Sequence, residues 1–343
     1  MAASTSRGDA VRPLYLHAVG HFHPENVIDN RFLEELDIGT NDEWILERVG
    51  IRARRTVLPL DYIRRTRNAD VRAGQEAALH TNVDTGRRAA LHALDRAGLS
   101  PKDIGMVVAG GCCPEMSIPA EACRLAAALG IEAPAFDINS ACSSFGAQLH
   151  LLASMDDLPP YVLVVNPENT TRVVDYSDRA TAVLWGDATS AAIVSREWPG
   201  RARIVSTSLA SSPMGWKAVT IPRFGHFVQD GGSVQRFAIK TSGAGLEALL
   251  PAARAHVAKT GGRVRFIGHQ ANLLMLEAVA RRAEIEPQDH FHNVVEHGNT
   301  GAAGAPSVLS QHWDDLKDGD SLVMVVVGSG LTWASLRLEM GAA

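Results

Sequence analysis

A weak internal repeat constrains the fold of this chain more than any other feature of its sequence. In the first half, an apolar, strand-like run at residues 135–138 leads into a block of small residues at 140–146, followed by a helical pattern and another strand-like run. In the second half, residues 293–295 lead into a similar block at 298–304, again followed by a helical pattern and a strand-like run. This repeated unit predicts two similar halves of one duplicated fold.

Each block of small residues contains one side chain suited to catalysis. Cys142 stands in the first block and Asn299 in the second. If the two halves pack face to face, these side chains lie near a common axis. The N-terminus of the helix that follows Cys142 would lower the pKa of its thiol, because unpaired N–H groups and the helix dipole stabilise a thiolate. Small residues at such turns are equally expected if they only let helices pack closely, so the repeat alone leaves both roles open.

The rest of the sequence is typical of an α/β protein. Its 343 residues predict about two folding units, and apolar strand-like runs alternate with helical patterns along the chain. We expect a disordered tail at residues 1–10, a first half at 11–197 that carries the nucleophilic cysteine, and a second half at 198–343. Within the second half, the pattern predicts a strand at 236–240 and a helix at 245–258.

Composition and charge exclude several classes of protein. The 46% of hydrophobic and 21% of charged residues are ordinary for a globular chain and exclude disorder. A net charge of -5 without a basic stripe argues against a nucleic-acid partner. The longest apolar runs, such as 322–327, are far shorter than the ~20 residues of a membrane helix. Because the first residues also lack the apolar core of a signal peptide, we expect a cytoplasmic protein without a membrane partner.

The four cysteines are too few and too clustered for a disulfide framework. Cys123 lies within a helical pattern and is expected to fill the core. Cys112 and Cys113 follow a strand-like run, and nothing in the sequence assigns them a role. Since no Cys-x-x-Cys pair or His/Cys set stands at ligand spacing, we expect no metal site.

A candidate base stands at the end of a later strand. His269 follows the strand-like run 264–267 and leads into a helical pattern, which is a favourable place for a catalytic side chain. His297 is its weaker competitor, because it lies two positions before Asn299. Both alternatives are open on the pattern of residues alone.

Several short motifs follow one another in a characteristic order. They are Asn41-Asp42-Glu43-Trp44-Ile45 with Gly50-Ile51-Arg52, Ala141-Cys142-Ser143, Asp178-Arg179, Trp185-Gly186-Asp187, His269-Gln270-Ala271-Asn272, His297-Gly298-Asn299-Thr300 and Gly328-Ser329-Gly330-Leu331-Thr332-Trp333. In this order they resemble the β-ketoacyl-acyl-carrier-protein synthase III family of the thiolase superfamily, over nearly the whole chain. The departures described below favour a member that serves polyketide or other specialised metabolism.

The resemblance implies an α/β, five-layered αβαβα homodimer built from two duplicated halves. It also implies a catalytic set of Cys142, His269 and Asn299, with an oxyanion hole formed by the backbone N–H groups of Cys142 and Gly330. The implied reaction is a Claisen condensation, in which Cys142 takes an acyl group and a malonyl-type thioester is decarboxylated and joined to it. A neutral amide at position 299 suits this reaction, because it can donate a hydrogen bond to an enolate.

The resemblance further implies where substrates bind. Trp44, Arg48, Arg179 and Asn272 match positions that hold coenzyme A, where aromatic stacking and Arg–phosphate pairing supply the affinity. We expect no resident cofactor, since the substrates are thioesters of coenzyme A or of an acyl carrier protein. Leu274 departs from the family, because many relatives carry an Arg there that pairs with phosphate or docks the carrier protein.

The acyl pocket is expected to include Ile118 and Phe224. In relatives, the loop at 114–119 crosses the dimer and closes the pocket of the partner. Relatives that join two long acyl chains place a Glu at the position of Ile118, whereas Glu115 is three residues away in this chain. The alternative function is therefore acyl transfer without decarboxylation, or the joining of two chains through acyl-Cys142. A catalytically silent scaffold is disfavoured, because Cys142, His269 and Asn299 are all retained.

Overall fold

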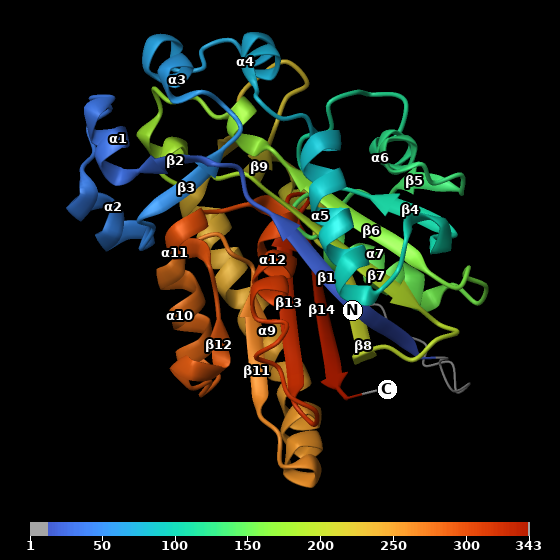
Figure 1. Cartoon of the computed structure of the whole chain (residues 1–343). Helices are drawn as coiled ribbons and strands as arrows, with labels where there is room; N and C mark the ends of the chain where they lie inside the picture. Colours follow the sequence, from blue (N-terminus) through green and yellow to red (C-terminus); the bar gives the residue numbers. More distant parts are fainter. Residues whose placement is uncertain (1–12, 342–343) are drawn as a thin grey trace.

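The computed structural model describes residues 13–341, so the tail expected at 1–10 lies outside the described residues. These residues form a sheet of ten strands in the order β12-β11-β13-β14-β8-β1-β7-β6-β4-β5 (Figure 1). The strands of the first half are β1 (Leu14–Phe22), β4 (Met106–Ala109), β5 (Ala135–Asp137), β6 (Val162–Glu168) and β7 (Ala188–Ser195). Those of the second half are β8 (Ala202–Ser211), β11 (Val264–Gly268), β12 (His290–Phe291), β13 (Ser321–Gly328) and β14 (Thr332–Met340).

The strand order confirms the duplication. From the edge of the sheet to its centre, the strand order is β5-β4-β6-β7-β1 in the first half and β12-β11-β13-β14-β8 in the second. In both halves these are the third, second, fourth, fifth and first strands of that half along the chain. The two halves join where β1 pairs antiparallel with β8, at Leu14 with Ile204 and Leu16 with Ala202. The boundary that we propose between residues 197 and 198 falls in the turn that connects β7 to β8.

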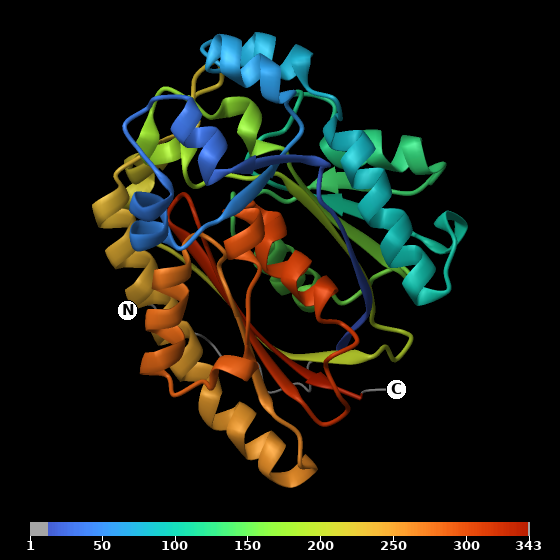
Figure 2. The ribbon, with the colours of Figure 1, turned by 60° about the vertical axis from the view of Figure 1, so that its left-hand side comes forward.

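Helices complete the five layers that the family resemblance implied. The inner helices are α7 (Ser144–Ser154), which packs on β6, β8 and β14, and α12 (Gly304–Gln311), which packs on β1, β7 and β11. Each inner helix therefore contacts strands of both halves. The outer faces are covered by α5 (Asn82–Ala97) and α6 (Glu121–Leu129) on one side and by α9 (Gly231–Thr260) and α10 (Leu273–Arg282) on the other (Figure 2).

Close packing of the inner helices depends on small residues. A Cβ added to Gly146 on α7 would lie 2.5 Å from the Cβ of Ala334 and 2.8 Å from Cγ2 of Val326. These distances leave no room for a side chain, so glycine lets α7 sit directly on β13 and β14. The block at 140–146 thus has a packing role at Gly146 as well as a candidate nucleophile.

The segment between β1 and α5 covers one end of the layers (Figure 1). It contains β2 (Asn26–Asp29), α1 (Asn30–Glu35), α2 (Asp42–Val49), β3 (Ala53–Thr56), α3 (Leu60–Thr66) and α4 (Val71–Ala77). The start of α2 is fixed by Asn41, whose side chain accepts a hydrogen bond from the N–H of Trp44 at 2.8 Å. This cap sets the direction in which α2 presents its candidate substrate-binding residues.

The remaining short elements lie in the connections. They are α8 (Arg179–Ala182), β9 (Val219–Thr220), β10 (Val228–Gln229) and α11 (Val294–His297). Within residues 13–341, no helix is both long and apolar enough to cross a membrane.

Two local predictions were wrong. The strand expected at 236–240 is part of α9, whose buried residues Ala238, Thr241 and Ser242 are too small or polar to show a helical pattern. The alternation of apolar side chains around Phe237 imitated a strand instead. Cys123 is exposed on α6 and does not fill the core, because its neighbours Ala122 and Leu125 occupy the buried face.

A cluster of histidines lies where β1, α5 and α11 meet. The rings of His23 and His297 are stacked with centroids 3.8 Å apart, and His21 lies 5.3 Å from His23 and 5.2 Å from His92. Burial, reinforced by the charge of neighbouring histidines and Arg96, lowers the pKa of His21 to about 4. Burial and the charge of Arg55 likewise lower the pKa of His297 to about 4. His21 and His297 are therefore neutral in the folded protein near neutral pH.

Acid should destabilise the fold through this cluster. The folded pKa of about 4 for His21 and His297 lies below the ordinary value of 6.5, so the unfolded chain binds more protons between these pH values. The free energy of unfolding is then highest above about pH 6.5 and falls as the pH is lowered toward about 4. We expect urea unfolding to show a loss of about 1 to 2 kcal/mol per histidine between about pH 7.5 and about pH 5.

A pair of variants separates this titration from lost hydrogen bonding. His21→Gln should reduce the acid-dependent loss, because glutamine cannot be protonated in this range. Ser310→Ala removes the partner that lies 2.8 Å from Nδ1 of His21 and should lower stability by the same amount at both pH values. An unchanged pH dependence in His21→Gln would show that the cluster does not control acid stability.

Candidate active site

The three candidate catalytic side chains line one cavity. This cavity has a volume of about 530 Å³, and Cys142, His269 and Asn299 all border it. They come from three separate turns, one in the first half and two in the second. Most of the remaining wall is apolar, with Trp185, Val219, Phe227, Phe237, Met275, Val327 and Leu331 among its residues.

The turn that carries Cys142 is held by its own polar groups. Ala141 has a φ of 49°, in the left-handed region, and its N–H donates to Oδ1 of Asn139 at 2.8 Å. The hydroxyl of Ser143 donates to the carbonyl of Ser140 at 2.7 Å, and that of Ser144 donates to the carbonyl of Ala141 at 2.6 Å. These bonds place the sulfur of Cys142 beside the cavity, just before the first turn of α7. The serines thus shape the turn.

A second cysteine, Cys112, contacts Cys142. The Sγ atoms of Cys112 and Cys142 lie 3.5 Å apart. Cys112 comes from the segment after β4, and its N–H donates to both carboxyl oxygens of Glu168 at 3.0 Å. The sequence assigned no role to Cys112 and did not identify Glu168. A charged residue at the end of the fully buried strand β6 is the signal that could have found this carboxyl.

Glu168 connects the two halves beneath the cavity. Its side chain is fully buried, and its Oε1 accepts a hydrogen bond from the N–H of Ala302 at 2.7 Å. A Cβ added to Gly301 would lie 2.5 Å from the same Oε1, so only glycine permits this approach. The small residues of the second block therefore bring its backbone directly onto a carboxyl group of the first half.

Electrostatics make Cys142 the thiolate of the cysteine pair. The hydrogen bond with Cys112, together with the hydrogen bond and charge of His269, lowers the pKa of Cys142 well below its ordinary value, although burial opposes this. The same contact, burial and the negative charge of Glu168 raise the pKa of Cys112. Burial and the charge of Cys142 raise the pKa of Glu168 to about 8. The location of Cys142 before a helix N-terminus favours the same assignment.

Asn299 is oriented with its amide nitrogen as the remaining donor. Its side-chain Oδ1 accepts a hydrogen bond from the N–H of Gly301 at 3.0 Å. Its backbone N–H donates to the carbonyl of Leu184 at 2.8 Å, so the side-chain Nδ2 is the donor that remains. His269 follows β11 and reaches the same cavity, as expected. His297 does not line the cavity, because its ring stacks on His23. The structure thus brings only the first of the two candidate histidines to Cys142.

The predicted coenzyme A residues lie together at this cavity. Trp44, Arg48 and Asn272 line it, and the guanidinium carbons of Arg48 and Arg179 lie 4.4 Å and 5.0 Å from the centroid of the Trp44 ring. Asn272 begins α10 by accepting a hydrogen bond from the N–H of Met275 at 3.2 Å, and its Nδ2 donates to the carbonyl of Arg48 at 3.3 Å. A ring and two cations therefore stand where an adenine nucleotide could bind.

Three other predicted residues do not line the cavity of this chain. Gly330 has a φ of 134°, and both of its neighbours along the chain border the cavity. Ile118 is 84% exposed and Phe224 is 65% exposed. Phe224 lies beside the guanidinium of Arg72, whereas Phe227 enters the cavity wall and is buried. Two aromatic residues three positions apart could not be told apart by sequence.

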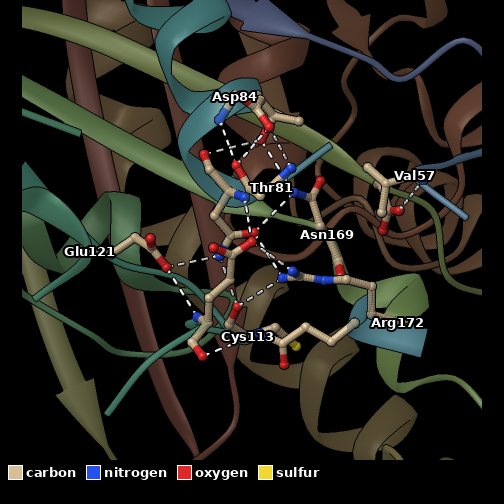
Figure 3. Close-up of polar contacts among 12 residues, drawn as sticks. Val57, Thr81, Asp84, Cys113, Glu121, Asn169 and Arg172 are labelled. Carbon is tan, nitrogen blue, oxygen red and sulfur yellow. Dashed lines mark hydrogen bonds and ion pairs between the residues drawn. The ribbon is translucent and has the colours of Figure 1, made fainter. Parts of the chain in front are cut away.

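A buried polar network anchors the loop that carries Ile118 (Figure 3). Glu115 accepts hydrogen bonds from Arg124 at 2.6 Å and from Arg172 at 2.8 Å. Asn82 accepts one from Arg172 at 2.9 Å and donates to the carbonyl of Cys113 at 3.0 Å. Although burial acts to raise it, the charge of Arg172 and these bonds hold the pKa of Glu115 below its ordinary value. Glu115 is therefore a paired carboxylate.

Comparison with known proteins identifies the family. Residues 136–213 match the family model described as 3-oxoacyl-[acyl-carrier-protein (ACP)] synthase III, and residues 263–340 match the model of its C-terminal part. The chain is 32% identical over 332 residues to the β-ketoacyl-[acyl-carrier-protein] synthase III of Oceanobacillus iheyensis, covering 94% of this chain and 97% of that relative.

Solved structures agree with the sequence comparison. The 3-oxoacyl-(acyl carrier protein) synthase III of Pseudomonas aeruginosa PAO1 superposes with a TM-score of 0.81 at 28% identity, covering 96% of this chain and 98% of that one. The priming β-ketosynthase from the R1128 polyketide biosynthetic pathway superposes with a TM-score of 0.78 at 26% identity, covering 99% of both chains. The chain belongs to the β-ketoacyl-[acyl-carrier-protein] synthase III family of acyltransferases.

Proposed function

We propose that this enzyme condenses an acyl group held on Cys142 with a malonyl-type thioester to give a β-ketoacyl thioester. The observation that carries the proposal is the meeting of Cys142, His269 and Asn299 in one largely apolar cavity. The family is one of condensing acyltransferases, and we assign its chemistry to the residues of this chain as follows.

In the loading step, the thiolate of Cys142 attacks the carbonyl carbon of an acyl thioester. The carbon–sulfur bond of the donor breaks, and the thiolate of the donor leaves. The lowered pKa of Cys142 keeps the nucleophile ionised at neutral pH, and the acyl-enzyme splits one difficult transfer into two easier ones. We assign the oxyanion hole to the backbone N–H groups of Cys142 and Gly330, where two donors could stabilise the tetrahedral oxyanion.

In the condensation step, a malonyl-type thioester loses carbon dioxide. Hydrogen bonds from His269 and Asn299 to the thioester oxygen would stabilise the enolate that forms. Asn299 is suited to this role, because its side-chain oxygen accepts a hydrogen bond from the N–H of Gly301, so its Nδ2 can donate to the substrate. The enolate carbon then attacks the acyl group on Cys142, and the cysteine leaves as a thiolate. Each such donor contributes roughly 10²–10³-fold to the rate.

The substrates enter past Trp44. We propose that this ring stacks on the nucleotide of coenzyme A and that Arg48 and Arg179 pair with its phosphates, which agrees with their placement around the ring. The relatives are named for synthesis on an acyl carrier protein, and we propose a carrier protein as a partner here too. Leu274, which is 39% exposed on α10, replaces the Arg of many relatives, so the docking surface differs there.

We further propose that the enzyme is a homodimer that serves polyketide or related specialised metabolism. The loop that carries Ile118 is anchored at its base, yet Ile118 itself is exposed, which supports a surface that a second copy covers. The likeness to a priming β-ketosynthase of a polyketide pathway supports the proposed type of metabolism. Joining of two acyl chains is less well supported, because the nearby Glu115 is paired with two arginines.

Acyl transfer to the enzyme tests the assignment of Cys142 as the nucleophile. The unsubstituted enzyme, incubated with a panel of acyl thioesters, should gain the mass of one acyl group in intact-protein mass spectrometry. Cys142→Ala should show none, because Cys142 is the one cysteine among the described residues that line the cavity, and the pKa of the neighbouring Cys112 is raised. Cys123→Ala is the matched control, since this exposed thiol lies on α6 away from the cavity. Persistent acylation of the Cys142→Ala protein would disprove the assignment.

The separation of the two steps is tested at His269. We expect His269→Ala to slow carbon dioxide release from a malonyl thioester by about 10²-fold or more, because the enolate loses a donor. Acyl loading should slow much less, because Cys112 and the helix N-terminus still lower the pKa of Cys142. The measurements are acyl-enzyme formation by mass spectrometry and β-ketoacyl product by chromatography. Normal product formation, or an equal loss of both steps, would remove His269 from the proposed role.

A further inference from the structure

The proposed reaction uses one thiol, but the structure places two at the site. Cys112 and Cys142 come from segments 30 positions apart, and their sulfur atoms lie 3.5 Å apart. Cys113, the neighbour of Cys112 along the chain, is buried and lies against the Asn82–Arg172 network through its carbonyl group. Only Cys112 therefore faces the nucleophile.

The two sulfur atoms are in contact. A disulfide has a sulfur–sulfur distance of about 2.05 Å, so closure requires the two sulfur atoms to approach by about 1.5 Å. Both cysteines belong to one packed group of side chains that includes Tyr176 and Trp185. Because Cys142 lines the cavity, a small solute that enters the cavity can reach its sulfur.

The charges at the site favour an unequal reactivity of the two thiols. Cys142 is the thiolate, since His269 and the thiol of Cys112 stabilise its charge. Cys112 is the protonated thiol, since its hydrogen bond to Cys142, its burial and the neighbouring carboxyl of Glu168 all raise its pKa. An accessible thiolate next to a protonated thiol is the arrangement of a peroxide-reactive cysteine and its resolving partner.

We propose that Cys142 and Cys112 are an oxidative modification site, at which a hydroperoxide converts the pair to a reversible disulfide. In the first step, the thiolate of Cys142 attacks a peroxide oxygen, so that a sulfur–oxygen bond forms and the oxygen–oxygen bond breaks. With hydrogen peroxide, the leaving hydroxide takes up a proton and becomes water, and Cys142 becomes a sulfenic acid. In the second step, the sulfur of Cys112 attacks that of Cys142, a disulfide forms, and the sulfenic oxygen leaves as a second water with the thiol proton of Cys112.

Glu168 can handle the proton of the second step. Its carboxyl contacts Cys112, and the negative charge of Cys142 is one reason why its pKa is raised. Oxidation of Cys142 to a neutral sulfenic acid removes that charge, which favours the carboxylate form of Glu168. The carboxylate then accepts the proton of Cys112 and returns it to the departing hydroxide. Glu168 thus both favours the protonated form of Cys112 and assists formation of the disulfide.

The disulfide would block acyl loading, a consequence that rests on the proposed function of Cys142. It would also protect the nucleophile, because a disulfide is reducible by thiols whereas a sulfinic acid is not. The modification itself depends only on the two sulfur atoms and on Glu168, so it can be measured without any substrate.

The test uses the full chain in a Cys123→Ser background, which removes the exposed thiol. The protein is treated with hydrogen peroxide, free thiols are blocked with N-ethylmaleimide, and the digested peptides are analysed by mass spectrometry. We expect the peptides of Cys112 and Cys142 to be linked, with a loss of about 2 Da relative to the two thiols. Acyl loading should fall by about tenfold or more and should recover after dithiothreitol.

Two variants provide the controls. Cys113→Ser should form the same linked peptides, whereas Cys112→Ser should form none and should accumulate sulfinic acid at Cys142 that dithiothreitol does not reverse. Sulfinic acid at Cys142 with an N-ethylmaleimide-blocked Cys112 in the parent protein would overturn the proposal, and so would a link to Cys113. If the linked peptides form in a protein that no acyl thioester loads before oxidation, the modification stands and the proposed function fails.

Discussion

The contact of Glu168 with both halves of the molecule is the interaction on which the site depends. This buried carboxyl accepts hydrogen bonds from the N–H of Cys112 in the first half and of Ala302 in the second. It therefore holds the segment after β4 and the block that follows Asn299 against each other. The duplicated fold supplies the two turns, and this shared acceptor fixes their distance. The cavity with its three candidate catalytic side chains is the result.

A neighbouring contact, between the sulfur atoms of Cys112 and Cys142, favours the ionised form of the candidate nucleophile. An unpaired charge is costly in a buried site, and Cys142 is stabilised as a thiolate only because a thiol, an imidazole and a helix N-terminus surround it. The hydrogen bond to Cys142, burial and the neighbouring Glu168 raise the pKa of Cys112, so the negative charge stays on the sulfur that borders the cavity. The proposed catalysis and the proposed oxidation both use this arrangement of Cys142, Cys112, His269 and Glu168.

Much of this architecture follows from the sequence, because it rests on repeated local patterns. The two blocks of small residues predicted the duplicated halves and the meeting of Cys142 with Asn299 at one cavity. Contacts that depend on how separate loops fold together left no such pattern, and the approach of Cys112 to Cys142 is the main example. The strand wrongly expected at 236–240 shows a related limit, since small and polar residues on the buried face of α9 conceal its helical period.

The ionisation of Cys142 is the central claim, and the pH dependence of its alkylation tests it most directly. The rate at which iodoacetamide modifies Cys142, followed by peptide mass spectrometry, rises in proportion to the thiolate fraction. We predict a midpoint well below the ordinary thiol pKa of about 8.5, and an upward shift of that midpoint in Cys112→Ala. A midpoint at the ordinary value, unchanged by Cys112→Ala, would contradict it.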